Sequence, residues 1–262
     1  MGELRVEHLS KTYARRDGWN RTRYLRVFED ISFTVRDGEF VSIIGSSGCG
    51  KSTLLSIAGG LSEPTGGAVY VDGNQVKGPG LDRGIVFQEF ALFPWLTVMG
   101  NVAFGLNSKG LPKEEKIRLA RKYVDLVGLS GFEDYHPHRL SGGMRQRVGL
   151  ARALAIEPSA LLMDEPFGAL DAQTRESMQN GLSDIWNTTR NTILFITHDI
   201  REAIYLSDRV LVMSGRPANI SLELTIDLPR PRHRHQAVFQ DYEARLEAAI
   251  GQRHDSAGSK AA

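Results

Sequence analysis

One segment constrains the fold of this chain more than any other: Gly45-Ser46-Ser47-Gly48-Cys49-Gly50-Lys51-Ser52, which matches the pattern G-x-x-x-x-G-K-[ST]. The apolar run from Phe40 to Ile44 before it predicts a buried strand, and the segment from Thr53 to Ala58 after it predicts a helix. Glycines let the backbone turn tightly and aim N–H groups at oxygen atoms, and the helix dipole adds to the attraction for an anion. The sequence therefore predicts a strand–loop–helix unit that binds phosphate groups.

The last side chains of this loop predict the rest of a nucleotide site. Lys51 is expected to reach the terminal phosphates of a nucleoside triphosphate, and the Ser52 hydroxyl is expected to bind Mg²⁺. The backbone from Gly45 to Thr53 is expected to surround the phosphates. The alternative is a glycine-rich turn that carries a lysine by chance, which requires neither the strand before it nor the helix after it.

The remaining pattern predicts a parallel sheet covered by helices on both faces. Apolar or alternating segments predict strands at 4–9, 27–35, 40–44, 67–71, 75–76, 84–87, 160–163, 192–197 and 209–213. Helical periodicity is found at 98–106, 113–127, 142–156, 172–188 and 200–206. Strands that alternate with helices indicate an α/β sheet, and the helical stretch from about 94 to 158 is expected as a subdomain inserted into it. A short polar tail is expected at 231–262.

Composition excludes several classes of protein. The 262 residues suffice for one large domain, and 41% hydrophobic and 24% charged residues are ordinary for a globular protein. A net charge of +1 gives no electrostatic reason to expect nucleic acid as a partner. The single cysteine, Cys49, excludes an internal disulfide and suits a reducing compartment. No apolar run is long enough to span a bilayer, so any membrane part of the system is expected to be another chain.

Two carboxylates follow the predicted strand at 160–163. Asp164 is expected to hold Mg²⁺ beside the phosphate loop, and Glu165 is expected to orient and deprotonate the water that attacks the γ-phosphate. By itself this pattern could equally be a strand that ends in a polar turn. The phosphate loop earlier in the chain favours the catalytic interpretation.

A second candidate anion site lies at Leu140-Ser141-Gly142-Gly143-Met144-Arg145-Gln146-Arg147. Ser141 is a good N-cap for the helix that follows, and Gly142 and Gly143 expose its first backbone N–H groups. A capped helix without a ligand is the commoner use of such a start. Taken alone, the segment favours the plain cap.

Six motifs in one order resemble the ATP-binding subunit of an ABC transporter: the loop at 45–52, Gln88, Leu140 to Gly143, Asp164-Glu165, Gly168-Ala169-Leu170-Asp171 and His198. The resemblance covers about residues 2–230 and implies one ATPase domain there. The implied fold is α/β, a P-loop NTPase (RecA-like) core sheet with an antiparallel β part and an inserted helical subdomain. The implied activity is hydrolysis of ATP with Mg²⁺.

The resemblance also assigns roles to individual residues. It implies a head-to-tail dimer of two copies, in which each ATP lies between the phosphate loop of one copy and Ser141 to Gly143 of the other. Tyr13 would stack on adenine, and Gln88 would sense Mg²⁺ and the attacking water. Asp171 would line the dimer contact, and His198 would hydrogen-bond the γ-phosphate. The family usually has glutamine where this chain has Met144, but the phosphate contacts come from the serine and the glycines.

A narrower resemblance points to the nitrate, sulfonate and taurine importers. It rests on segments 77–88, 92–98 and 101–106 and on the ending Leu228-Pro229-Arg230-Pro231-Arg232. It implies transmembrane permease subunits as partners, a periplasmic or lipoprotein solute-binding protein as an indirect partner, and the cytoplasmic face of the inner membrane as the location. A soluble ABC-type ATPase acting on ribosomes or DNA is the alternative. Such proteins usually carry two cassettes or a long coiled coil, and this chain has neither.

Two further segments have a predicted surface role. Residues 14–26 are rich in arginine and are expected to form a solvated loop, with contact to lipid headgroups or the permease as the alternative. The aromatic stretch from Phe90 to Trp95 follows Gln88 directly and is expected to form the docking surface for a permease helix. Core packing of those aromatic rings is the alternative.

Overall fold

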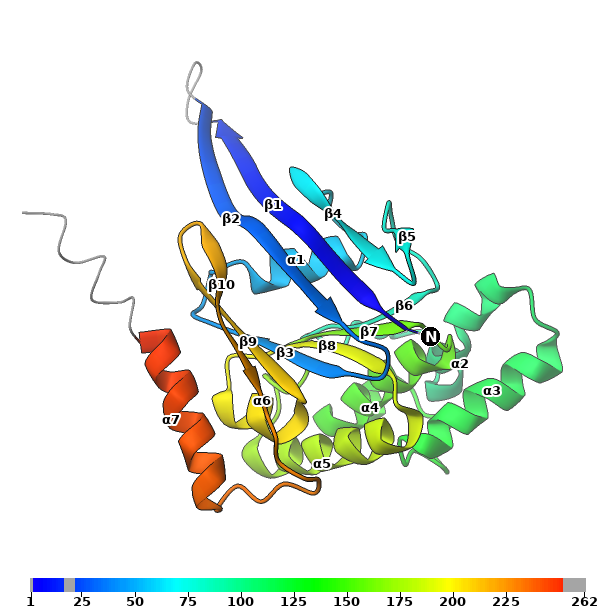
Figure 1. The fold of residues 1–262 in the computed structure, drawn as a ribbon. Helices are drawn as coiled ribbons and strands as arrows, with labels where there is room; N and C mark the ends of the chain where they lie inside the picture. Colours follow the sequence, from blue (N-terminus) through cyan, green and yellow to red (C-terminus); the bar gives the residue numbers. More distant parts are fainter. Residues whose placement is uncertain (1, 17–21, 252–262) are drawn as a thin grey trace, which may run out of the picture.

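A single continuous sheet runs through the computed structural model, which describes residues 2–16 and 22–251. Within these residues the sheet has ten strands in the order β5-β4-β1-β2-β10-β9-β3-β8-β7-β6. Figure 1 shows its curled form, with helices on both sides. The α/β class with an antiparallel part, expected from the sequence, is thereby confirmed.

The parallel part of the sheet carries the phosphate loop. It consists of β3 (Phe40–Ile44), β8 (Thr192–Ile196), β7 (Ala160–Asp164) and β6 (Arg83–Val86), with β9 (Arg209–Gly215) parallel to β3 on its other side. All five residues of β3 and of β8 are buried. Strands covered on both faces need apolar side chains at successive positions, which explains why these runs were recognisable in the sequence.

The antiparallel part contains strands that are longer or more numerous than predicted. It is formed by β1 (Leu4–Arg16), β2 (Thr22–Val35), β4 (Gly66–Val71) and β5 (Asn74–Gln75), and β10 (Ala218–Thr225) pairs antiparallel with β9. A one-pair parallel bridge, Ala218 with Phe28, joins β10 to β2 and makes the sheet continuous. The sequence analysis did not predict β10.

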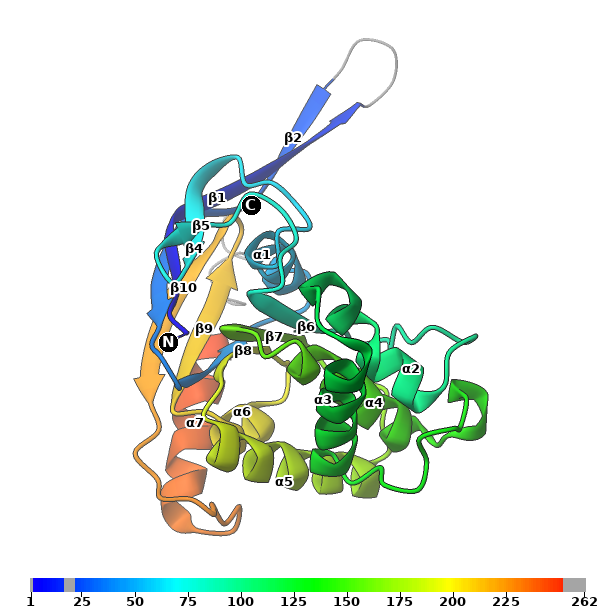
Figure 2. The ribbon, with the colours of Figure 1, turned by 90° about the vertical axis from the view of Figure 1, so that its right-hand side faces the viewer.

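Helices cover the two faces of the sheet. Side chains of β3 alternate between them: Val41 and Ile43 pack in the core beneath α1 (Lys51–Ala58), whereas Phe40 packs on the opposite face. That opposite face carries α5 (Ala172–Thr189) and α6 (Ile200–Leu206). The chain between β6 and β7 contains helices and no strands. They are α2 (Val98–Ala103), η1 (Gly105–Lys109), α3 (Lys113–Leu126), η2 (Pro137–Arg139) and α4 (Gly142–Ala155). Figure 2 shows α2, α3 and α4 grouped at one end of the sheet.

The arginine-rich stretch at 14–26 is not a solvated loop over the part that the structure describes. β1 and β2 continue as a paired ribbon in which Tyr13 faces Leu25 and Ala14 faces Tyr24. Cross-strand pairing satisfies the backbone groups, and the aromatic and β-branched residues near Thr22 and Tyr24 favour a strand. Residues 17–21, including Arg21, lie outside the described residues.

A helix, α7 (Ala237–Gly251), is found within the region where a polar tail was expected. Phe239 and Leu246 are fully buried and pack with Ile204 of α6 and Val210 of β9. Apolar residues recur here every three to four positions, so one face of α7 packs against α6 and the face of the sheet at β9. The prediction of a polar tail was wrong for these residues.

Truncation of Phe239 tests whether α7 is part of the cooperative fold. We expect Phe239→Ala to lower the free energy of unfolding by about 3–5 kcal/mol, because a fully buried phenyl ring leaves a cavity. Urea denaturation followed by circular dichroism measures the change. Val238→Ala is the matched control, because Val238 is the preceding residue and is 51% exposed. Equal stability of the two variants would show that α7 does not contribute to the fold.

Candidate active site

The phosphate loop lies between β3 and α1 and depends on its glycines. Gly48 and Gly50 have φ values of 76° and 103°, in the left-handed region that glycine adopts without strain. A Cβ atom on Gly50 would lie 2.5 Å from Val27 Cγ1, and one on Gly45 would lie 2.1 Å from the carbonyl oxygen of Met213. Side chains at these positions would displace the strands on which the loop rests. The loop can therefore lie this close to its neighbouring strands only with glycine at these positions.

The start of α1 presents backbone donors. Its first intrahelical bond runs from Leu54 N to Gly50 O at 2.9 Å, so the N–H groups of residues 50–53 have no partner within the helix. Ser46, Ser47 and Gly48 are exposed on the loop, whereas the Cys49 side chain is 2% exposed and packs in the core. The part of Cys49 that faces the loop is therefore its backbone.

Lys51 is folded back into this loop. Its ammonium group donates to the carbonyl oxygens of Gly45 at 2.8 Å and Ser46 at 3.2 Å, and the residue is buried. These bonds hold a buried cation at the mouth of the loop, where its charge complements phosphate oxygens.

Ser52 and Asp164 meet beside the loop. The Ser52 hydroxyl donates to Asp164 Oδ1 at 3.1 Å. Burial raises the pKa of Asp164, while the bond from Ser52 and the charge of Lys51 act in the opposite direction. A hydroxyl and a carboxylate side by side are the oxygen ligands that Mg²⁺ prefers, so these two residues fit a magnesium site.

Glu165 and His198 lie at the ends of neighbouring strands. Because β7 and β8 are adjacent and parallel, the segments that follow them emerge at the same edge of the sheet. Glu165 Oε2 is 2.8 Å from His198 Nδ1. The Glu165 backbone has a φ of 43° and its N–H donates to the carbonyl oxygen of Ile196 at 2.9 Å, which turns the side chain out of the strand direction.

Gln88 reaches the same edge from the strand on the other side of β7. Its Nε2 atom lies 3.3 Å from the position of a Cβ on Gly168, and Gly168 N donates to the carbonyl oxygen of Glu165 at 3.1 Å. The structure therefore brings Gln88 to the loop that carries Glu165. Lys51, Ser52, Asp164, Glu165 and His198 join it at the carboxyl ends of the parallel strands.

Tyr13 lies further along the antiparallel ribbon. It is 43% exposed, and Lys11 Nζ lies 4.7 Å from the centre of its ring. Lys11 pairs with Phe28, and Phe28 lies 3.1 Å from the position of a Cβ on Gly50. Tyr13 is thus two residues beyond the point where the ribbon meets the phosphate loop, with its ring open to solvent. The stacking of Tyr13 on adenine, which the family resemblance implies, stays a prediction.

The second candidate anion-binding segment, Ser141 to Gly143, contacts α5. Ser141 caps α4 by accepting a bond from Met144 N at 3.3 Å. A Cβ on Gly143 would lie 2.6 Å from Thr174 Cγ2, and Asp171 caps α5 by accepting from Thr174 N at 3.0 Å. That bond lowers the pKa of Asp171. Among the described residues, the contacts of Gly142 and Gly143 are with α5, its preceding loop and Phe90.

Two further residues, Arg175 and Glu202, support the edge of the sheet that carries Glu165 and His198, and neither was predicted from the sequence. Arg175 donates to the carbonyl oxygens of Phe167 at 3.3 Å and Leu170 at 2.9 Å and so fixes the loop after Glu165. Glu202 is buried next to the His198 loop. The sequence did contain a signal for Glu202, because an aspartate followed three residues later by a glutamate is a helix-capping pattern. In the structure, Glu202 N donates to Asp199 Oδ1 at 3.1 Å.

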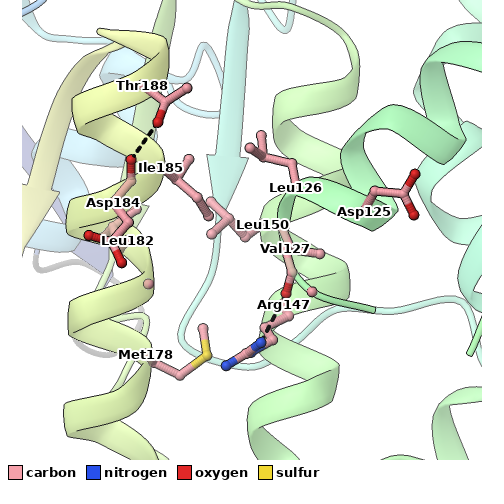
Figure 3. A pocket seen from close by; sticks show the side chains of 12 residues that line it. Asp125, Leu126, Val127, Arg147, Leu150, Met178, Leu182, Asp184, Ile185 and Thr188 are labelled. Carbon is pink, nitrogen blue, oxygen red and sulfur yellow. Dashed lines mark hydrogen bonds between the residues drawn. The ribbon is translucent and has the colours of Figure 1, made fainter. Parts of the chain in front are cut away.

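A cleft of about 290 Å³ lies elsewhere, between the end of α3, α4 and α5 (Figure 3). Leu126, Leu150 and Ile185 line it, and Arg147 Nη1 donates to the carbonyl oxygen of Val127 at 3.0 Å at its margin. None of its lining residues belongs to the predicted site. Backbone donors and charged side chains, rather than cleft size, therefore define the active site.

The sequence is similar to those of several known proteins. The sequence profile of the ABC transporter family matches residues 28–168. An uncharacterised ABC transporter ATP-binding protein of Methanocaldococcus jannaschii is 50% identical over 93% of this chain and 90% of its own length. A nitrate import ATP-binding protein of Synechocystis sp. is 53% identical over 77% of this chain and 76% of its own. A taurine import ATP-binding protein of Burkholderia pseudomallei is 49% identical over 90% and 88%, respectively.

Solved structures give the same result. A dimeric ATP-binding cassette in a post-hydrolysis state bound to ADP and Pi is 32% identical, with a TM-score of 0.73 over 86% of this chain and 100% of its own. No helix in the described part of this chain has the length and apolar character needed to cross a membrane. The chain belongs to the family of ABC transporter ATP-binding proteins, which are ATPases.

Proposed function

We propose that this chain is the ATP-hydrolysing subunit of an importer for nitrate, a sulfonate, taurine or a similar small solute. The observation that carries the proposal is the convergence of Lys51, the Ser52–Asp164 pair and the Glu165–His198 pair at one edge of the sheet. Relatives named for nitrate import and taurine import, at 53% and 49% identity, support the choice of solute class.

Binding of the triphosphate is assigned to the loop and the start of α1. Backbone N–H groups at 48–53 donate to phosphate oxygens, and Lys51 exchanges its carbonyl partners for the terminal phosphates. Mg²⁺, when bound, neutralises charge on the β- and γ-phosphate oxygens. Ser52 and Asp164, which are hydrogen-bonded at 3.1 Å, would hold this ion, and Gln88 is assigned to the same metal site.

Hydrolysis is assigned to the Glu165–His198 pair. Glu165 accepts the proton of the water that attacks the γ-phosphate, and the 2.8 Å contact with His198 fixes the carboxylate in position. His198 presents its other ring nitrogen to a γ-phosphate oxygen. Arg175, by holding the loop at Phe167 and Leu170, keeps Glu165 in place during the step.

A second copy of the chain completes each site in this proposal. Ser141, Gly142 and Gly143 present a capped helix start that contacts α5 of the same chain. Their N–H groups then serve the nucleotide bound by a partner in a head-to-tail dimer. The dimeric state of the related cassette structures supports this arrangement.

The transport partners follow from the same relatives. We propose that the chain binds transmembrane permease subunits at the cytoplasmic face of the inner membrane, with a periplasmic or lipoprotein solute-binding protein delivering the solute. Co-expression with the permease subunits that co-purify with this chain, followed by vesicle uptake of nitrate, taurine and an alkanesulfonate, tests the proposal. ATP-dependent uptake of one of these solutes is expected, and uptake that persists without this chain would contradict it.

The aromatic stretch after Gln88 supplies the proposed permease contact. Trp95 is 70% exposed, and its ring packs against Phe93 at 5.5 Å, which in turn contacts Phe104 at 4.3 Å. Phe90, Leu92 and Arg145 line an adjoining open groove that begins at Gln88. Core packing of Trp95, the alternative left open by the sequence, is excluded by this exposure. An exposed tryptophan on an apolar patch is typical of a protein-binding surface.

Replacement of Trp95 separates coupling from catalysis. We expect Trp95→Ala to change the free energy of unfolding by less than about 0.5 kcal/mol and to leave ATP hydrolysis intact, because the side chain is exposed. Pull-down of the permease and solute uptake should both fall at least about tenfold, as for an interface hot spot. Val238→Ala is the control, because it removes a 51% exposed apolar side chain on α7, outside both the aromatic stretch and residues 14–26. Normal permease binding by Trp95→Ala would place the docking surface elsewhere.

A further inference from the structure

The loop that carries His198 is held by its two neighbours. Asp199 N donates to Thr197 Oγ1 at 3.0 Å, and Asp199 Oδ1 in turn accepts the N–H of Glu202 in the first turn of α6. Thr197 is buried, whereas the His198 side chain is 65% exposed toward the site. The orientation of His198 therefore depends on how α6 and Thr197 are fixed.

Glu202 fixes both from inside the protein. Only 5% of the residue is exposed, and among the described residues no cation lies within ion-pair distance of its carboxylate. That carboxylate accepts a bond from Gln179 Nε2 on α5 at 2.8 Å, and Glu202 lines one small cavity together with Thr197 and His198. Burial raises the pKa of Glu202. A buried carboxylate needs such a donor, so loss of the bond from Gln179 is costly at this position.

The other end of Gln179 is held by the segment between β10 and α7. Gln179 Oε1 accepts a bond from Arg234 Nη2, and Arg234 Nη1 bonds Glu176 Oε1 at 3.0 Å. The Arg234 guanidinium also lies 4.3 Å from the ring centre of Tyr205 on α6. Figure 1 shows this segment, in orange, passing alongside α5 before α7 begins. One guanidinium thus braces α5 against α6.

The contacts form an unbroken path to the reacting groups. It runs from Arg234 through Gln179 and Glu202 to Asp199, and the adjacent His198 contacts Glu165. Glu202, His198 and Glu165 also line one cavity of about 20 Å³, which is large enough for a single water molecule. A change at Glu202 therefore acts on the groups that face the γ-phosphate.

We propose that Arg234, Gln179 and Glu202 are positioning residues for ATP hydrolysis, which hold the His198 loop although none of them contacts the nucleotide. The C-terminal segment, through Arg234, is then part of the hydrolytic apparatus. This inference rests on the proposed roles of Glu165 and His198. It requires that the effect be on turnover and not on nucleotide affinity.

The test compares arginine variants of the full-length chain. Arg234→Ala should lower kcat about tenfold, a factor that corresponds to ~1.4 kcal/mol, with the Kd for ATP unchanged. Arg234→Lys keeps the charge and the contact with Glu176 but not the fork that also reaches Gln179, so an intermediate kcat is expected. Arg201→Ala is the matched control, because Arg201 lies on α6 and pairs only with Glu243 at 3.2 Å, at 52% exposure. Its kcat should equal that of the wild type.

A double-mutant cycle shows whether the path is one unit. Arg234→Ala combined with Gln179→Ala should lower kcat no more than Gln179→Ala alone, because either change breaks the same path. Additive losses, or an Arg234→Ala kcat equal to that of Arg201→Ala, would overturn the proposal. The proposal would also be overturned if the lower kcat of Arg234→Ala were explained by a smaller fraction of folded, ATP-binding protein. Hydrolysis that survives in Glu165→Gln would instead refute the assignment of the catalytic base, a distinct outcome.

Discussion

Glu165→Gln should lower the rate of ATP hydrolysis by about 10²–10⁴-fold and leave ATP binding intact. The amide has the size of the carboxylate and still meets His198, whose Nδ1 lies 2.8 Å from Glu165 Oε2. It is no longer a base for the attacking water. Single-turnover hydrolysis measures the rate, and equilibrium dialysis measures the affinity for ATP.

The same variant should accumulate as an ATP-bound dimer. If hydrolysis is what reopens the dimer, ATP with Mg²⁺ should shift Glu165→Gln to a smaller elution volume on gel filtration, and ADP should not. Glu115→Gln is the control, because Glu115 lies on α3 and pairs only with Arg118, at 2.5 Å. Undiminished hydrolysis by Glu165→Gln would remove Glu165 from the mechanism.

The parts of the fold that could be predicted are those in which local pattern and burial agree. Phe40–Ile44 and Thr192–Ile196 are apolar at nearly every position because the strands are covered on both faces. The helices at 113–126 and 200–206 were predicted almost to the residue, since their apolar faces are local features. Such signals do not depend on what the rest of the chain does.

The missed elements fall into two kinds. For β10 and α7 a signal was present: Ile220, Leu222 and Leu224 alternate with polar residues, and Phe239 and Leu246 share one helical face. The ribbon formed by β1 and β2 is different. Its outer pairs, such as Ala14 with Tyr24, depend on two polar segments finding each other, which no periodicity within either segment specifies.

The site shows the same division. Motifs at strand ends located Lys51, Asp164, Glu165 and His198, because parallel strands deliver their carboxyl ends to one edge. Neither the inward packing of Cys49 nor the link between Arg234 and Gln179 could be predicted from the sequence. The latter joins residues 55 positions apart in sequence, so only the tertiary structure brings them together.

Mixing two inactive variants should restore hydrolysis if each site is built from two chains. Lys51→Ala removes the ammonium group that lies 2.8 Å from Gly45 O, and Ser141→Arg places bulk and charge at the start of α4. Each variant alone should lose at least about 10²-fold in rate, because a charge-stabilising group or the second anion site is missing. Random pairing should put about half of the dimers in the mixed form, each with one intact and one doubly damaged site.

Recovered activity should therefore approach about a quarter of the wild-type rate if the two sites act independently. The informative control mixes Lys51→Ala with Glu165→Gln. Ser52 on α1 bonds Asp164 at 3.1 Å, so Lys51 and Glu165 of one chain belong to the same half-site. No mixed dimer of that pair has an intact site, and no recovery is expected. Recovery in both mixtures, or in neither when differently tagged chains are shown to co-purify, would contradict a site shared between Lys51 of one chain and Ser141 of its partner.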